Sequence, residues 1–174
     1  MKKILTISMI FLFASCQVQH IPIKGNYTVK NEFISQKPYD EVWSNIIDIF
    51  AKNGIPIGVL DKTSGIITSP EQSFPNNYTY ELDNGSLENP TAWIVLERIV
   101  GPDGRQVTPQ KVTAIWNVRI KQINTGVSVN INLLNINGSL VSTSRYGTIS
   151  ETWNGKSTGV FESIIFKQIN NPEK

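Results

Sequence analysis

The side chains best suited to nucleophilic and metal chemistry are scarce, because the sequence contains one cysteine, Cys16, and one histidine, His20. A cysteine or histidine hydrolase needs a nucleophile with a base within hydrogen-bond reach. A zinc site of the usual kind needs several cysteine or histidine ligands, and a disulfide within the chain needs a second cysteine. We therefore expect no such enzyme, no metal site and an ordinary solvated role for His20.

Carboxylate pairs are the remaining groups that could do acid–base work, and the candidates are Asp40, Glu41 and the nearby Asp48. They fall on the polar side of a predicted amphipathic helix, the first two beside its positive N-terminal end, where acids stabilise a helix. The run Gly101-Pro102-Asp103-Gly104-Arg105 lacks the strand and helix context of a phosphate-binding loop and indicates a turn. The sequence gives no positive evidence of catalysis, so we expect a protein that is not an enzyme and has no cofactor.

The N-terminal residues have the pattern of a secretion signal. Lys2 and Lys3 precede an apolar run of ten residues, Ile4 to Phe13, which ends in the small residues Ala14 and Ser15. A helix that crosses a bilayer needs roughly 18 or more apolar residues, so a permanent span is not expected. We predict that residues 1–15 are a signal peptide that is removed.

The tetrad Phe13-Ala14-Ser15-Cys16 resembles the lipobox of bacterial lipoproteins. The resemblance implies cleavage before Cys16 and lipid on its thiol, the only covalent group expected. Several acyl chains hold a protein to a membrane far more firmly than one. The residue after Cys16 is Gln17 and not aspartate, and in this the chain resembles lipoproteins that are passed on to the outer membrane. The expected location is thus the cell envelope, lipid-anchored at the outer membrane.

Charge excludes one class of partner. The sequence has 16 basic and 14 acidic residues, and loss of Lys2 and Lys3 with the signal leaves 14 of each. Such a neutral domain has no electrostatic reason to bind nucleic acid. We expect the membrane to be reached through lipid, and we expect the remaining partner to be an envelope protein complex.

Two helices are predicted by spacing. Residues 38–53 carry apolar side chains three and four positions apart, with Pro38 at the first helical position and Gly54 as the terminating cap. A second helix is expected from about Ser157 to Asn170, with Phe161, Ile164 and Ile165 on its apolar face. Trp43 in the first helix is expected to be core, and so is Trp93.

Strands are predicted between these helices. Residues 55–60 and 65–69 form an expected hairpin, and residues 91–100 an expected strand. Residues 114–123 and 127–133 alternate strictly between apolar and polar, which indicates an antiparallel pair with one buried face that includes Trp116. The predicted fold class is α+β, with two layers: a mainly antiparallel sheet and an N-terminal and a C-terminal helix on one face. We expect one domain over residues 35–170, preceded by a flexible tether over residues 16–34.

The hairpin Leu60-Asp61-Lys62-Thr63-Ser64-Gly65-Ile66-Ile67-Thr68, together with Val42-Trp43, Gly54 and the helix start Ser157-Thr158-Gly159-Val160-Phe161-Glu162, resembles the helix-grip domain of BamC-like outer-membrane lipoproteins. These are accessory subunits of the β-barrel assembly machinery and their relatives. The resemblance implies a helix-grip fold over roughly residues 35–170 and a role beside other proteins of the periplasm and outer membrane.

Aromatic residues outside the predicted core are the candidates for a binding surface, since exposed aromatic side chains often anchor partners. They lie in the long excursion of residues 71–90 and before the second helix: Phe74, Tyr78, Tyr80, Tyr146 and Trp153. The alternative is that they seal the edge of the core.

Two functions remain open. The first is a non-enzymatic interaction or accessory module that docks on an envelope complex. The second is a carrier whose first helix closes over a curved sheet and leaves a cavity for a lipid or another small apolar ligand. A cavity of a few hundred Å³ would separate the second from a solid core.

Overall fold

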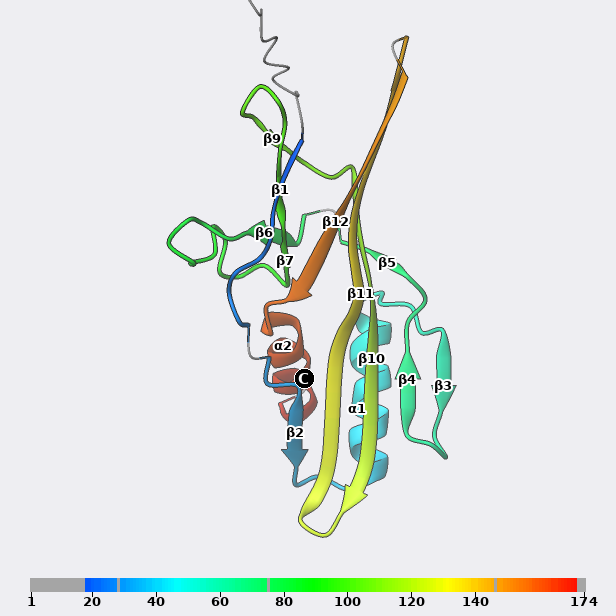
Figure 1. Ribbon diagram of the computed structural model, residues 1–174. Coiled ribbons are helices and arrows are strands. Elements are labelled where there is room, and N and C mark those ends of the chain that lie inside the picture. The colour runs from blue at the N-terminus through cyan, green and yellow to red at the C-terminus, as the bar shows by residue number, and fades with distance from the viewer. Residues whose placement is uncertain (1–17, 28, 75, 146, 172–174) are drawn as a thin grey trace, which may run out of the picture.

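The computed structural model describes residues 18–171, except residues 28, 75 and 146. The described part contains two helices and twelve strands, shown in Figure 1. In chain order they are β1 (Gln19–Ile21), β2 (Glu32–Ser35), α1 (Tyr39–Lys52), β3 (Val59–Asp61), β4 (Ile66–Thr68), β5 (Gln72–Ser73), β6 (Tyr78–Tyr80), β7 (Ile94–Leu96), β8 (Arg98–Val100), β9 (Gln106–Val107), β10 (Lys111–Ile123), β11 (Gly126–Ser144), β12 (Gly147–Ser157) and α2 (Val160–Asn170).

The centre of the fold is the antiparallel pair β10–β11, which confirms the alternation seen in the sequence. The strands pair from Ile123 opposite Gly126 to Lys111 opposite Ser139. The alternating apolar side chains are buried on one face: Ala114, Trp116, Val118, Ile120, Val127, Val129, Ile131 and Leu133.

Strand β11 is shared by two parts of the structure. Its other edge pairs first with β2, through Val127–Asn130, and then with β12, through Asn137–Ser144. Between these stretches the register to β10 shifts between Thr113 and Ile115, and Asn135 has a left-handed φ of 51°. Such an irregularity bends a strand and increases its twist. β2 and β12 therefore lie end to end along one edge of β11.

The larger sheet has the order β3-β4-β10-β11-β12-β7-β6, and a small sheet has the order β1-β8-β9. The pairing between the described strands is antiparallel except for the parallel pair β6–β7. The expected hairpin of residues 55–69 is present as β3–β4. The fold is α+β with two helices and mostly antiparallel sheets, as the sequence predicted.

Helix α1 follows the predicted boundaries closely. Pro38 is its N-cap, one position earlier than expected, and the Pro38 carbonyl accepts from the Val42 N–H at 3.0 Å. At the other end the N–H of Gly54 donates to Ala51 and that of Ile55 to Phe50, with Gly54 at φ 63°. This is the Schellman arrangement, in which glycine takes the left-handed position at no steric cost.

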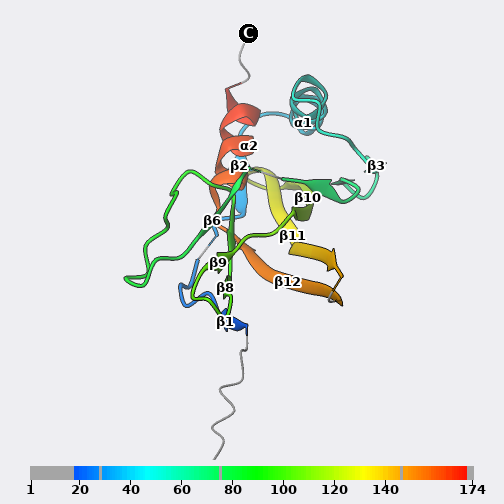
Figure 2. The same cartoon turned by 90° about the horizontal axis from the view of Figure 1, so that it is seen from above.

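Helix α1 buries Val42, Trp43, Ile46, Ile49 and Phe50, and the Phe50 ring stacks on Trp116 of β10 at 3.9 Å between ring centroids. Helix α2 lies beside α1, with the Asn45 side chain donating to the Ile169 carbonyl. Figure 2 shows both helices on the same side of the β10–β11 pair. No helix of the described residues is long and apolar enough to cross a bilayer.

The structure differs from the sequence prediction at the N-terminal segment. Residues 16–34 were expected to be a flexible tether, yet β1 pairs with β8 and most of β2 pairs with β11 within that range. Phe33 of β2 is buried and stacks on Phe166 of α2 at 4.0 Å. The strands are only three and four residues long, too short for a period-two pattern to show in the sequence.

Residues 91–100 also differ, because they form two strands in two sheets in place of one strand. β7 joins β12 and β8 joins β1, with Glu97 between them. The Glu97 carboxylate accepts from the backbone and side-chain N–H groups of Asn154, at 2.9 and 3.2 Å. This long-range contact holds the chain at the point where it changes sheets.

The ends of β11 and β12 project from the body of the protein as a two-stranded hairpin beyond the last pairing of β10 (Figure 1). We call residues 140–145 and 147–150 the distal ribbon. Val141 and Ile149 in it are 58% and 59% exposed. The distal ribbon thus carries apolar side chains that the described residues do not cover.

Candidate functional site

A cavity of about 290 Å³ lies between the C-terminal end of α1, helix α2 and the β5 end of the larger sheet. We call it the helix–sheet cavity. Its lining is mainly aromatic and aliphatic and comes from five separate segments of the chain: Asn53, Gly54, Ile55, Pro56, Gln72, Ser73, Phe74, Trp93, Trp116, Phe161, Ile164, Ile165 and Gln168. Its size is at the lower end of the range for small-molecule sites.

Backbone hydrogen bonds place the aromatic walls. Phe74 N–H donates to the Val112 carbonyl at 2.8 Å, which fixes residue 74 at the edge of β10. Trp93 N–H donates to the Asn77 side chain at 2.8 Å, and the Trp93 carbonyl accepts from Thr158 N–H at 3.0 Å. Trp93 is therefore held between the residue 71–90 excursion and the start of α2.

The Trp93 ring joins the two sides of the cavity. It meets Phe74 edge-on at 5.9 Å between centroids and Phe161 of α2 at 5.1 Å. The Schellman turn at Gly54 takes the chain away from the helix axis, so that Ile55 and Pro56 close the end of α1. The cavity thus lies where α1 ends and the chain turns away from the helix axis.

Two polar atoms in the lining residues lack partners. The indole Nε1 of Trp116 and the amide Oε1 of Gln168 are buried, and neither has a hydrogen-bond partner among the described residues. A buried donor or acceptor that is left unpaired costs about 1–3 kcal/mol. Both atoms have almost no accessible surface, so a molecule in the cavity would reach them only if these side chains turned toward it.

The candidate residues from the sequence are only partly brought together. Phe74 lines the helix–sheet cavity. Tyr78 and Tyr80 pack edge to face at 5.7 Å along a separate open groove. Tyr80 and Trp153 are 6% and 1% exposed and belong to the hydrophobic core, so their side chains offer little surface to a partner.

Two further observations agree with the core positions of Tyr80 and Trp153. Burial raises the pKa of the Tyr80 phenol far above its ordinary value. Trp153 pairs across the sheet with Gly138, and a side chain at residue 138 would come within 2.9 Å of the Trp153 Cβ. Cys16 and Tyr146 lie outside the described residues.

His20 has partners that its expected solvated role did not include. Its Nδ1 lies 3.7 Å from the Glu97 carboxylate and its Nε2 lies 3.4 Å from that of Glu151. The imidazole, which is 46% exposed, therefore joins β1 to the connection between β7 and β8 and to β12. These carboxylates are far from His20 along the chain, so no local pattern predicts the contacts.

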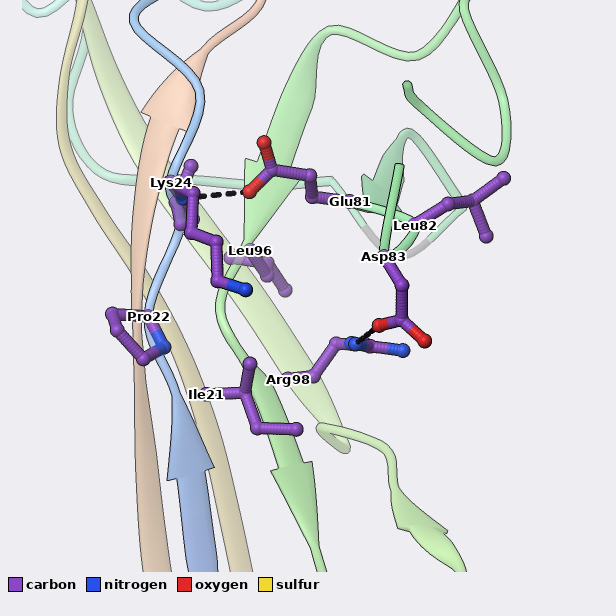
Figure 3. A pocket seen from close by; sticks show the side chains of 9 residues that line it. Ile21, Pro22, Lys24, Glu81, Leu82, Asp83, Leu96 and Arg98 are labelled. Atoms are coloured by element: carbon purple, nitrogen blue, oxygen red, sulfur yellow. Dashed lines mark hydrogen bonds and ion pairs between the residues drawn. The ribbon is translucent and has the colours of Figure 1, made fainter. Parts of the chain in front are cut away.

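Two more open grooves, one beside Tyr78 and one beside Leu133, have volumes of about 350 and 370 Å³, and a further hollow is far smaller. The hollow in Figure 3, between residues 21–24, residues 81–83 and the side chains of Leu96 and Arg98, holds about 10 Å³, room for one water. There the Lys24 backbone N–H donates to Glu81 at 2.6 Å, and Arg98 forms an ion pair with Asp83. The described residues contain no group of three or more histidine, cysteine, aspartate or glutamate side chains arranged to hold a metal ion.

Residues important to the helix–sheet cavity were missed by sequence reasoning. Trp93 and Trp116 were assigned to the core, and Gln168 carried no signal beyond its place on α2. The cavity joins parts of the chain that are far apart, so no local spacing predicts it. Its chemistry suits the binding of a mostly apolar molecule.

The comparisons with known proteins add no relative: no family model matches the chain, and the searches of curated proteins and of solved structures give no significant match.

Proposed function

We propose that this protein is a lipid-anchored, non-enzymatic protein of the bacterial envelope that binds a small, mainly apolar molecule in the helix–sheet cavity. The observation that carries the proposal is the cavity itself, with its aromatic walls and the unpartnered Trp116 Nε1 and Gln168 Oε1. A solid core at this position would have excluded the binding of a ligand there.

The ligand follows from the lining. A volume of about 290 Å³ suits a small ligand, at the lower end of the range for small-molecule sites. Trp116 needs an acceptor and Gln168 needs a donor. A hydroxyl group, or a protonated carboxyl group, supplies both at the end of an apolar body. The proposed class is a short-chain alcohol or acid, or a ring compound of similar size.

The envelope location rests on the tetrad Phe13-Ala14-Ser15-Cys16 and the preceding apolar run. Acylation of Cys16 would attach the domain to a membrane, and Gln17 favours the outer one. Within the α+β class, the proposed fold is a helix-grip arrangement. It is supported by α1 and α2, which lie together against the long β10–β11 pair and leave the cavity at one end.

Native mass spectrometry of the acylated protein tests the binding function, with 1-decanol and decane as probes. We expect a one-to-one complex with 1-decanol that is lost in Ile164→Trp, since a larger side chain at this lining position fills the cavity. Ile34→Trp, a change at an exposed position outside the lining, is the matched control and should retain binding. Equal, weak adduct formation by all three proteins would contradict the proposal.

A second candidate function is that of an interaction module docking on an envelope complex. Strand β3 is the edge of the larger sheet, and its Val59 and Leu60 are 53% and 52% exposed. An exposed apolar edge strand can pair with another chain. Mild affinity purification from solubilised envelopes should then recover a stoichiometric partner that Val59→Lys releases. Recovery of the protein alone in several detergents would count against this role.

A further inference from the structure

The first observation concerns how closely the domain is held to its expected lipid anchor. Strand β1 begins at Gln19, which pairs with Val100, and His20 contacts Glu97 and Glu151. Only three residue steps separate Gln19 from Cys16. A fully extended chain covers at most about 10 Å in three steps. If Cys16 carries lipid, the β1 end of the domain must lie next to the bilayer surface.

The second observation is that the distal ribbon lies at this same end. In Figure 1 the paired ends of β11 and β12 run toward the end of the molecule where β1 begins, opposite the β10–β11 turn. Glu151, which pairs with Leu140 at the base of the distal ribbon, is the residue that contacts His20 at 3.4 Å.

The lengths of the two segments agree. Four strand steps lead from Glu151 outward to Gly147, about 13 Å. Four steps also lead from His20 back to Cys16, at most about 14 Å. Starting from neighbouring residues, the distal ribbon therefore reaches as far as the chain that ends in the lipid.

The third observation is the chemistry of the distal ribbon. From Ser139 to Ser150 the sequence has no acidic residue and one basic residue, Arg145. Val141 pairs with Ser150 and Ile149 with Ser142, so the two exposed apolar side chains point to opposite faces. Both faces combine an aliphatic group with hydroxyl groups, which suits the boundary between headgroups and acyl chains.

From these three observations we propose that the distal ribbon is a second membrane contact, inserting Val141 and Ile149 into the headgroup region of the bilayer that holds Cys16. This inference rests on the proposed acylation of Cys16. It gives the domain a fixed orientation, with β1 and the distal ribbon on the membrane and the β10–β11 turn farthest from it. A single flexible anchor would leave the orientation free.

The test uses spin labels on the full acylated protein in vesicles of phosphatidylethanolamine and phosphatidylglycerol. Acylation consumes the Cys16 thiol, so Ser142→Cys provides a single labelling site on the distal ribbon. Thr125→Cys, exposed in the β10–β11 turn, is the matched control at the opposite end. Accessibility to oxygen, which concentrates in lipid, is compared with accessibility to a water-soluble nickel chelate.

We expect the ratio of oxygen to nickel accessibility to be several-fold higher at residue 142 than at residue 125. Replacing Val141 and Ile149 together by serine should abolish this difference while the protein stays on the vesicles. Equal ratios at the two sites would overturn the inference and leave the proposed anchoring intact. Protection of residue 142 from both reagents would do the same, because it would indicate that protein and not lipid covers the distal ribbon. A protein that does not float with vesicles and shows a bare Cys16 thiol by mass would instead defeat the proposed anchoring, and the inference with it.

Discussion

Ser157 donates its hydroxyl hydrogen to the carboxylate of Glu162, with both carboxylate oxygens at 2.9 Å from the serine oxygen. Leu133 N–H of β11 donates to the same carboxylate at 3.2 Å. Glu162 thus ties the first turn of α2 to the end of β12 and to the central strand. It is nevertheless 1% exposed, and this burial raises the pKa of its carboxyl group above the ordinary 4.5.

The raised pKa of Glu162 predicts a pH-dependent stability. The folded protein holds this proton more tightly than the unfolded chain, so the free energy of unfolding falls as pH rises from about 4.5 through the folded pKa. Glu162→Gln, uncharged at every pH, should lack this fall. In denaturant unfolding between pH 4 and 8, the free energy of unfolding of the variant should increase relative to that of the native protein as pH rises. Asp48→Asn removes an exposed carboxylate from α1 and controls for the change in net charge. If the free energy of unfolding of the native protein and of Glu162→Gln had the same pH dependence, burial of Glu162 would not make stability depend on pH.

Gly65 is predicted to be intolerant of a side chain. Its φ is 71°, and a Cβ there would lie 2.0 Å from the Ile120 carbonyl oxygen. Gly104 has a similar φ of 77° with nothing within 4 Å, which makes Gly104→Ala the matched control for backbone strain. The strain alone costs about 1–2 kcal/mol. Thermal unfolding should show a clearly larger loss for Gly65→Ala; equal losses would mean that β4 can move from β10 without cost.

Trp116→Phe tests the polar part of the ligand proposal. The substitution keeps an aromatic wall and removes the unpartnered Nε1–H. Loss of one hydrogen bond of about 0.5–1.5 kcal/mol weakens binding roughly 2- to 10-fold. Titration should show weaker binding of 1-decanol with decane unaffected. The same loss for both probes would show that only shape was disturbed.

Cys16→Ser tests the anchor. The hydroxyl cannot form the thioether to the lipid, so the protein should leave the membrane fraction and become soluble after cell fractionation. The described fold begins at residue 18 and should unfold at an unchanged temperature. Unaltered partition into the membrane fraction would contradict lipidation at this residue.

The sequence predicted elements whose pattern is long enough to be unambiguous. The alternation around Trp116 spans most of two strands, and the apolar spacing of residues 38–53 extends over several turns. The local pattern was therefore enough to predict these elements without knowledge of tertiary contacts. The hairpin β3–β4 was predicted for a similar reason, since the turn from Asp61 to Gly65 has its own chemistry. The Asp61 carboxylate accepts from the N–H groups of Thr63 and Ser64 at 2.9 and 3.2 Å.

The rest depends on contacts between distant residues. β1 is three residues long and is defined by its pairing with β8, some eighty positions away. The burial of Trp153 follows from the glycine opposite it, and the helix–sheet cavity needs Phe74, Trp93 and Phe161 to meet. Phe74 was among the aromatic residues expected to form a binding surface, and it lines this cavity. No local pattern indicates that Phe74 contacts Trp93, because the two residues are nineteen positions apart.

The double pairing of β11 has a consequence for how the chain acquires its structure. Asn130 pairs with Glu32, nearly a hundred residues earlier, while Ser144 pairs with Gly147, only three positions later. The local hairpins can close within microseconds, but the N-terminal strand must find its place after most of the chain has been made. Because one strand completes both regions, neither is an independent folding unit. We expect a single cooperative transition, with the β2 contact forming last.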